Sequence, residues 1–306
     1  MEKRSVPPLI SESLAMLEVA RRIRRAARAD SPVLIWGEQG TGKKLVAETI
    51  HRQSRRSDGP LVIVPREKSG DQSVEDELFG TAEQPSRLIS ATGGTLLIEE
   101  IAGLSPTGQA KLLAATEGRY VADLGDSAGQ PIDFRLMATS RNELAESVER
   151  GAVREDLYYR LTVVTIRVPP LRERKEDIPR LVQHILGELC AARERPAPAV
   201  HPALMHYLVE HPWPGNGREL RALLESIVLA GDPEILEIDH VRASFCNNGT
   251  SSTGFSWAER IDTLDELEHA AVIRALRTHQ GNRTRAARSL GISVRTLQRK
   301  LKHWSA

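Results

Sequence analysis

The stretch GEQGTGKK, residues 37–44, has the composition and spacing of a phosphate-binding loop (P-loop). Its glycines allow backbone N–H groups to turn toward an anion, and Lys43 can reach the phosphate oxygens. An apolar run precedes the loop and a helical pattern follows it, which is the context that G-x-x-x-x-G-K requires. We therefore predict a nucleotide site, against the alternative of a structural glycine turn, formed by Gly37, Glu38, Gln39, Gly40, Thr41, Gly42, Lys43 and Lys44.

Two adjacent carboxylates, Glu99 and Glu100, end the apolar run GGTLLIEE. In nucleotide hydrolases the first such carboxylate contacts magnesium through water, and the second orients the attacking water. The first is usually aspartate, and a displacement of about 1 Å can cost on the order of a hundredfold in rate. Lys44 occupies the usual Ser or Thr position and cannot bind a cation. We assign Glu99 to nucleotide binding and Glu100 to catalysis, with Mg²⁺ left open; the alternative is a pair of exposed carboxylates.

The elements that must position these residues alternate between short apolar strands and helices. The patterns predict strands over 31–37, 60–64, 94–100, 133–140 and 161–168, and helices over 13–30, 43–53, 105–116 and 143–150. This alternation is typical of a mostly parallel sheet covered on both faces. The strand pattern then stops, and an all-helical lobe is predicted from helices at 178–195, 202–210 and 217–230.

The C-terminal segment is strongly basic although the whole chain has a net charge of only +1. Its pattern predicts helices over 264–279, 283–290 and 294–304, with a turn at Gly291, as in a helix-turn-helix. Arginine and glutamine can contact base edges, while arginine and lysine can bind phosphates. We predict contact with double-stranded DNA, against the alternative of a charged solvent-exposed helix, through Arg283, Thr284, Arg295, Thr296, Gln298, Arg299, Lys300 and Lys302.

Composition narrows the remaining possibilities. A chain of 306 residues can hold two or three domains. Its two cysteines lie in no Cys-x-x-Cys or Cys/His cluster, so neither a disulfide framework nor a zinc site is predicted. No signal peptide and no run of about 18 apolar residues is present, so we expect a cytoplasmic protein without a membrane partner.

Five blocks resemble, in order and spacing, the central AAA+ domain of sigma-54-dependent transcription activators, also called bacterial enhancer-binding proteins: VLIWGEQGTGKKLVAETIH, DELFG, GGTLLIEEI, VREDLYYRLTVVTIRVPPLRERKEDIP and WPGNGREL. The C-terminal segment is similar to the Fis-type helix-turn-helix of the same family. The resemblance implies an α/β P-loop AAA+ parallel-sheet domain with a helical lid, followed by a small all-α domain. The expected boundaries are 1–172 for the nucleotide-binding subdomain, 173–246 for the lid, 247–262 for a linker and 263–306 for the DNA-binding domain.

The same resemblance implies further roles. Arg154 and Arg160 match the arginines that reach a neighbouring subunit's nucleotide, so they join Glu100 as expected catalytic residues. Arg218 matches the lid arginine that contacts the nucleotide. ATP or ADP is the expected ligand. Self-association is expected as a dimer through the C-terminal domain, with a possible ring through the AAA+ domain.

The sequence departs from the family in five places. The sigma-54-binding GAFTGA motif is absent, and its place is taken by the shorter connection 81–92. Lys44 replaces glutamate, Pro65 replaces the asparagine that restrains the catalytic glutamate, Glu99 replaces aspartate, and Ser140 replaces the sensor I asparagine. These differences favour nucleotide binding over efficient hydrolysis.

We therefore expect a sequence-specific DNA-binding transcriptional regulator that binds ATP and does not contact sigma-54. A second hypothesis is an ATP-hydrolysing remodelling ATPase that acts on the transcription machinery, because the arginines at 154 and 160 are retained. A third is a DNA-binding scaffold that works without nucleotide.

Overall fold

The computed structural model describes residues 9–65, 74–81, 85–117, 132–231, 233–241 and Arg283. The expected linker and the rest of the expected helix-turn-helix lie outside the described residues. Residues 1–241 form one compact unit, and the fold described below belongs to that unit.

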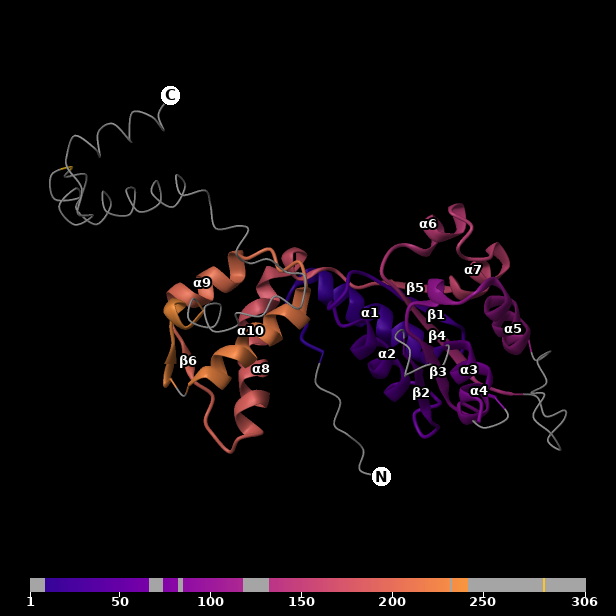
Figure 1. Cartoon of the computed structure of the whole chain (residues 1–306), viewed down its shortest axis with the longest axis horizontal. Helices are drawn as coiled ribbons and strands as arrows, with labels where there is room; N and C mark the ends of the chain where they lie inside the picture. The colour runs from indigo at the N-terminus through magenta and orange to yellow at the C-terminus, as the bar shows by residue number, and fades with distance from the viewer. Residues whose placement is uncertain are drawn as a thin grey trace. The chain divides into compact units, whose positions relative to one another are not determined.

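A five-stranded parallel sheet lies among the helices α1 to α7 of this unit, with the strand order β2-β3-β4-β1-β5 (Figure 1). The strands are β1 (Val33–Trp36), β2 (Leu61–Val64), β3 (Thr95–Ile98), β4 (Arg135–Ser140) and β5 (Val164–Arg167). All five predicted strands and the parallel arrangement are confirmed. β3 and β4 are buried along their whole length, which explains why the apolar residues of β3 and of the middle of β4 are consecutive and do not alternate with polar ones.

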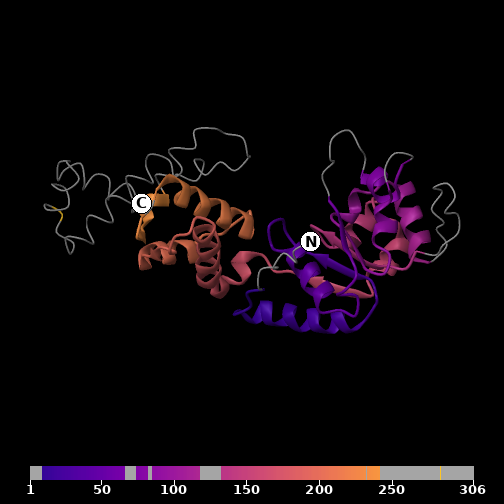
Figure 2. The ribbon, with the colours of Figure 1, turned by 90° about the horizontal axis from the view of Figure 1, so that it is seen from below.

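Helices cover both faces of the sheet (Figures 1 and 2). One face packs against α1 (Leu14–Arg28) and α2 (Lys43–Arg52). The other carries α3 (Val74–Phe79), α4 (Arg87–Ser90), the 3-10 helix η1 (Ile101–Gly103), α5 (Pro106–Thr116), α6 (Leu144–Glu149) and α7 (Glu155–Leu161). No helix in the described ranges is both long and apolar enough to cross a membrane.

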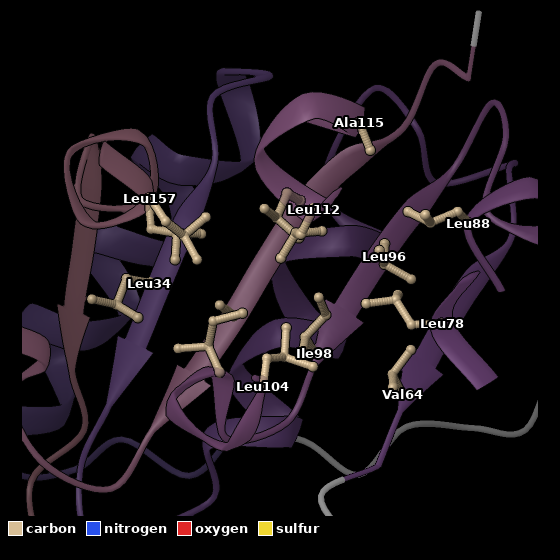
Figure 3. Close-up of a cluster of buried hydrophobic side chains, with 14 of the residues drawn as sticks. Leu34, Val64, Leu78, Leu88, Leu96, Ile98, Leu104, Leu112, Ala115 and Leu157 are labelled. Atoms are coloured by element: carbon tan, nitrogen blue, oxygen red, sulfur yellow. The ribbon is translucent and has the colours of Figure 1, made fainter. Parts of the chain in front are cut away.

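The sheet divides the apolar core into two clusters because successive side chains of a strand point to opposite faces. In β3, Leu96 and Ile98 belong to the cluster with α5 and α7, whereas Leu97 belongs to the cluster with α1 and α2. Figure 3 shows the first cluster, in which Leu112 of α5 and Leu157 of α7 lie over the strands. These two fully buried clusters fix the strand ends that carry the candidate site.

The lid follows two 3-10 helices, η3 (Leu171–Glu173) and η4 (Lys175–Asp177). It consists of α8 (Ile178–Ala191), α9 (Pro202–Glu210) and α10 (Asn216–Ala230), together with the two-residue strands β6 (Ala199–Val200) and β7 (Ile235–Leu236). The prediction of an all-helical lobe was therefore wrong in one detail, since β6 and β7 pair in parallel. Two residues cannot display a strand period, and α3 and α4 are likewise too short to show a helical one.

The beginning of α1 is joined to the beginning of the lid through Asp177. This fully buried carboxylate accepts hydrogen bonds from the backbone N of Glu12 (2.7 Å), the backbone N of Ser13 (2.7 Å) and Ser13 Oγ (2.8 Å). Ser13 Oγ in turn accepts from Met16 N at 3.3 Å as the N-cap of α1. One side chain thus positions both elements.

Candidate nucleotide-binding site

The predicted site residues gather at the carboxyl ends of the central strands. Gly37 follows β1, Glu99 and Glu100 follow β3, and Ser140 ends β4. The backbone N of Gly37 donates to Ser140 O at 3.1 Å, which joins two of these strand ends. Open parallel sheets bind ligands at this edge.

The backbone of the P-loop needs glycine at defined positions. Gly37, Gly40 and Gly42 have φ of 152°, 79° and 101°. A Cβ on Gly37 would lie 2.4 Å from Val168 O, and one on Gly40 would lie 2.2 Å from Gly215 O, so neither position accepts a side chain. Around Gly42, by contrast, no atom of the described residues lies within 4 Å of the Cβ position, which leaves room for a ligand.

Lys43 lies folded over the loop that precedes it. Its Nζ donates to Gly37 O at 2.6 Å and to Glu38 O at 3.0 Å. Thr41 Oγ1 also donates to Glu38 O, at 2.8 Å. The ammonium group is therefore held within the loop, where it can exchange these carbonyl partners for phosphate oxygens.

The remaining loop carbonyls are held by donors from the lid and the segment before it. Asn216 Nδ2 binds Gln39 O at 3.0 Å, Gly217 N binds Gly40 O at 3.1 Å, and Arg174 Nη2 binds Thr41 O at 2.8 Å. The three consecutive carbonyls of residues 39–41 are thus bonded to the lid and the segment before it. No described residue accepts a hydrogen bond from the backbone N–H of Gln39, Gly40 or Gly42. Such unpaired amides at the start of a helix bind anions.

The electrostatics of Lys43 identify its neighbours. Burial lowers the pKa of Lys43; Glu100 opposes this effect, Arg218 adds to it, and Glu99 and Glu38 oppose it. Glu99, Glu100 and Arg218 therefore lie within electrostatic reach of Lys43, as a shared phosphate site requires. Lys44 is exposed in the first turn of α2.

Glu38 directs its side chain toward the lid. Its carboxylate binds both terminal nitrogens of Arg172, at 2.7 and 2.5 Å, and accepts from Asn216 Nδ2 at 3.2 Å. The Arg172 guanidinium holds the pKa of Glu38 below its usual range. The side chain of Glu38 therefore links the loop to Arg172 and Asn216.

Glu100 lies in an unusual backbone conformation, with φ 61° and ψ 67°. Its backbone N donates to Thr139 Oγ1 at 3.1 Å, and its Oε1 accepts from the backbone N of Arg141 at 3.2 Å. Its Oε2 lies 3.5 Å from Arg141 Nε, so the guanidinium forms an ion pair with the carboxylate. Left-handed backbone in a residue other than glycine is concentrated at functional sites. Sequence reasoning missed Arg141, and its position directly after Ser140 was the available signal.

The structure describes the surroundings of Pro65 and Ser140, two positions at which the sequence differs from the family pattern. Pro65 follows β2 beside Glu99, whose backbone N donates to Val64 O at 2.9 Å, and proline contributes no side-chain donor there. Ser140 is buried, and its Oγ donates to Asn142 O at 2.8 Å. The Ser140 hydroxyl is therefore used within its own turn.

Arg154 and Arg160 lie apart from this cluster. Both are exposed at α7, where Arg154 binds Asp156 at 3.0 and 2.7 Å and Arg160 Nη2 donates to Thr116 O at 2.9 Å. Neither is among the charged groups named above that act on the pKa of Lys43. The structure therefore places Glu100 within electrostatic reach of Lys43 and leaves both arginines exposed at α7.

The donor set can be tested against magnesium. Mg²⁺ is usually bound by one or two carboxylates together with substrate phosphates and waters. Glu99 and Glu100 supply such oxygens beside Lys43, and no group of three or more His, Cys, Asp or Glu in the described part of the chain could hold a metal. The residues fit a cation that is bound mainly through phosphate.

Of the predicted DNA-binding residues, only Arg283 is described, and it is exposed. Thr284, Arg295, Thr296, Gln298, Arg299, Lys300 and Lys302 lie outside the described residues. Their role stays a prediction.

The parallel sheet, the P-loop at its carboxyl edge and the helical lid define a P-loop domain of the AAA+ class. The family model described as the sigma-54 interaction domain matches residues 9–167, the AAA+ ATPase lid domain matches 172–256, and the model described as bacterial regulatory protein, Fis family, matches 263–304. The chain belongs to the family of transcriptional regulators built on the sigma-54 interaction domain. The predicted fold class and family are confirmed.

Named relatives support this membership. The chain is 37% identical over 302 residues to the transcriptional regulatory protein ZraR of Klebsiella oxytoca, covering 96% of this chain and 68% of that protein. It is 35% identical over 303 residues to the C4-dicarboxylate transport transcriptional regulatory protein DctD of Rhizobium meliloti, covering 96% and 64%. The crystal structure of NtrX from Brucella abortus in complex with ATP matches with a TM-score of 0.72 and 31% identity, covering 98% of this chain and 70% of NtrX.

Proposed function

We propose that this protein is a DNA-binding transcriptional regulator that binds ATP in its P-loop. The observation that carries the proposal is the arrangement of the P-loop, in which the carbonyls of residues 39–41 bond to donors from the lid and the segment before it, while Lys43 Nζ lies over the loop. The loop is thus prepared for an anion without rearrangement of its backbone. NtrX, a solved structure similar to this chain over nearly its whole length, is described in complex with ATP and with ADP.

Binding uses three kinds of group from this chain. The amides of Gln39, Gly40 and Gly42 and the first turn of α2 bind the phosphates. Lys43 leaves its carbonyl partners to contact the terminal phosphates, and Arg218 approaches from the lid. Glu99 would help to hold Mg²⁺, which when bound neutralises part of the phosphate charge.

Efficient hydrolysis is not part of the proposal. Glu100 must orient the attacking water, yet its carboxylate is paired with Arg141, at 3.2 Å to the backbone N and 3.5 Å to Nε. Pro65 has no donor that could draw the carboxylate into another position, and the Ser140 hydroxyl is bonded within its own turn. We therefore propose that ATP acts chiefly as a bound ligand that changes the state of the regulator.

We also propose that the protein does not contact sigma-54. The hexapeptide GAFTGA does not occur in the 306 residues. Transcription with sigma-54 polymerase at a promoter carrying the protein's DNA site measures this directly. Activation that depends on ATP would overturn this part of the proposal.

The ATP proposal is tested by thermal unfolding with and without saturating Mg-ATP. Wild type and Lys175→Ala, which loses only an exposed ion pair with Glu210, are expected to melt at a higher temperature with nucleotide. Lys43→Ala is expected to lose this increase. A wild-type melting temperature that does not respond to nucleotide would contradict the proposal.

A second candidate, an ATP-hydrolysing remodelling ATPase, is favoured by the exposure of both Arg154 and Arg160 at α7. In that function the two arginines would reach the nucleotide of a neighbouring subunit in a ring. Phosphate release and particle mass, measured together with Mg-ATP, separate the candidates. Rapid turnover that disappears in Arg160→Ala would favour the second one.

A further inference from the structure

We propose that Asn216 is a positioning residue that sets the conformation of the P-loop, so that the lid prepares the loop for ATP. The proposal deepens the nucleotide-binding function proposed above and rests on it. Asn216 begins α10 and lies 177 residues from its loop partner Gln39.

The Asn216 side chain is fully buried and fully engaged. Its Nδ2 donates to Gln39 O at 3.0 Å and to Glu38 Oε2 at 3.2 Å. Its Oδ1 accepts from the backbone N of Leu171 at 2.7 Å. A buried amide that lacks such partners is costly, so the side chain favours one arrangement of the groups around it.

Asn216 therefore joins three segments of the chain: the P-loop, η3 and α10. Arg172, the neighbour of Leu171 in η3, binds the carboxylate of Glu38 and adds a second link between the same segments. A movement of the lid relative to the loop would therefore disturb the hydrogen bonds of Asn216 and those of Arg172 at the same time.

The backbones of the lid and the loop are also in contact. Gly217 N donates to Gly40 O at 3.1 Å, and Gly215 O occupies the place where a Cβ on Gly40 would lie. The backbone of Gly40 therefore lies in close contact with the backbone at the start of α10. Asn216 limits the rotation of the 39–40 peptide, because its side chain binds the carbonyl of Gln39.

The consequence for binding follows from the planarity of the peptide. The Gln39 carbonyl and the Gly40 N–H belong to one rigid unit and point in opposite directions. When Asn216 holds the carbonyl toward the lid, the N–H points into the phosphate site. Without that hydrogen bond the unit can rotate, and a preformed anion contact is lost.

Two substitutions separate this role from general stability. Asn216 has φ 53°, a conformation that glycine adopts without strain, so Asn216→Gly removes the side chain and keeps the backbone. Asn216→Asp keeps the shape and the acceptor for Leu171 N, but it places a carboxylate oxygen against Gln39 O and Glu38. Arg221→Ala is the control on the same helix, because it removes only an exposed contact with Glu188.

The experiment measures the ATP dissociation constant, the melting temperature without nucleotide and the amide hydrogen exchange of residues 37–44. Asn216→Gly is expected to weaken ATP binding about tenfold, which corresponds to about one or two hydrogen bonds. Asn216→Asp is expected to weaken it further, and Arg221→Ala to leave it unchanged. Faster exchange of the loop amides is expected in Asn216→Gly even without nucleotide.

The outcomes distinguish this inference from the proposed function. If wild type does not bind ATP, the proposed function fails, while loop exchange in nucleotide-free protein still tests Asn216. If wild type binds and Asn216→Gly binds equally well, the inference is overturned. A lower melting temperature with unchanged affinity and unchanged loop exchange would likewise assign Asn216 a structural role only.

Discussion

Glu100 combines two features that matter for catalysis, a left-handed backbone and a carboxylate paired with Arg141. At the end of β4, Thr139 Oγ1 accepts from the backbone N of Glu100, and the backbone N of Arg141 donates to the Glu100 carboxylate. We propose that Arg141 supplies in this chain a restraint on Glu100 that Pro65 cannot provide. This pairing was not predictable from either residue alone.

If the Arg141 guanidinium restrains Glu100, its removal should weaken the restraint, although the backbone N of residue 141 still donates to Oε1. Arg141→Ala is expected to raise the rate of phosphate release from ATP severalfold over wild type, because Oε2 of Glu100 loses this ion pair and can orient water more readily. Arg141→Lys, which keeps the positive charge, is the matched control and should remain near the wild-type rate. Equal rates for wild type and Arg141→Ala would contradict the restraint.

Glu219 provides a second prediction at this scale. Its Oε2 accepts from Gly215 N at 2.6 Å, while its buried Oε1 has no hydrogen-bond partner among the described residues. Burial raises the pKa of Glu219. The folded state therefore binds this proton more tightly than the unfolded chain does, so the stabilisation is complete at acid pH and is lost as pH rises through the raised pKa.

Glu219→Gln removes this titration and keeps an acceptor for Gly215 N. We expect its melting temperature to exceed that of wild type by about 1–3 °C at neutral pH, with the difference disappearing toward acid pH. Thermal unfolding across a pH series measures this, with the exposed Glu225→Gln on α10 as control. A constant difference at all pH values would contradict the explanation.

At the scale of elements, several side chains connect the lid to the sheet domain, and some of them form hydrogen bonds to more than one segment. Asn216 and Arg172 connect the lid to the P-loop, and Asp177 connects it to the start of α1. Arg174, buried between these contacts, binds Thr41 O. The nucleotide loop is therefore framed by segments that are distant in sequence.

Asp177→Ala tests the second connection. The change leaves the amides of Glu12 and Ser13 and the Ser13 hydroxyl without their acceptor, and it should lower the free energy of unfolding by on the order of 3 kcal/mol. Asp177→Asn, which keeps the shape and one acceptor, should cost less. Denaturant unfolding gives both values, and an equal cost would show that the hydrogen bonds to the charged carboxylate are not the cause.

At the scale of the whole molecule, the proposed nucleotide-binding unit, residues 1–241, is followed in the chain by a basic C-terminal segment that matches the Fis family model. The seven basic residues between positions 281 and 306 are expected to bind the DNA backbone and base edges. We propose a dimer through this segment and a ring through the AAA+ domain. Measurements of particle mass with and without Mg-ATP test both assemblies.

Arg299→Ala tests the DNA-binding prediction. We expect weaker binding to the specific site, by about 1–3 kcal/mol if Arg299 contacts a base, and a slope of log affinity against log salt that is smaller by about one if it contacts a phosphate. Titrations at several salt concentrations distinguish these two roles. An affinity and slope equal to wild type would refute the assigned recognition helix, and Arg221→Ala in the lid is the control.

Local patterns in the sequence were sufficient for the strands, the P-loop and the family. Apolar runs such as LLI in β3 and the glycine spacing of residues 37–44 reflect burial and backbone conformation, which are properties of neighbouring residues. The same patterns correctly placed α8, α9 and α10 but missed β6 and β7, because two paired residues have no period.

The tertiary structure decided which side chains meet. The bond between Asn216 and Gln39, the pairing of Glu38 with Arg172 and the restraint of Glu100 by Arg141 depend on packing between segments that are far apart in the chain or at different strand ends. The sequence therefore predicted the P-loop pattern, whereas only the fold showed that Asn216 of the lid binds this loop, because a hydrogen bond across 177 residues leaves no periodic signal.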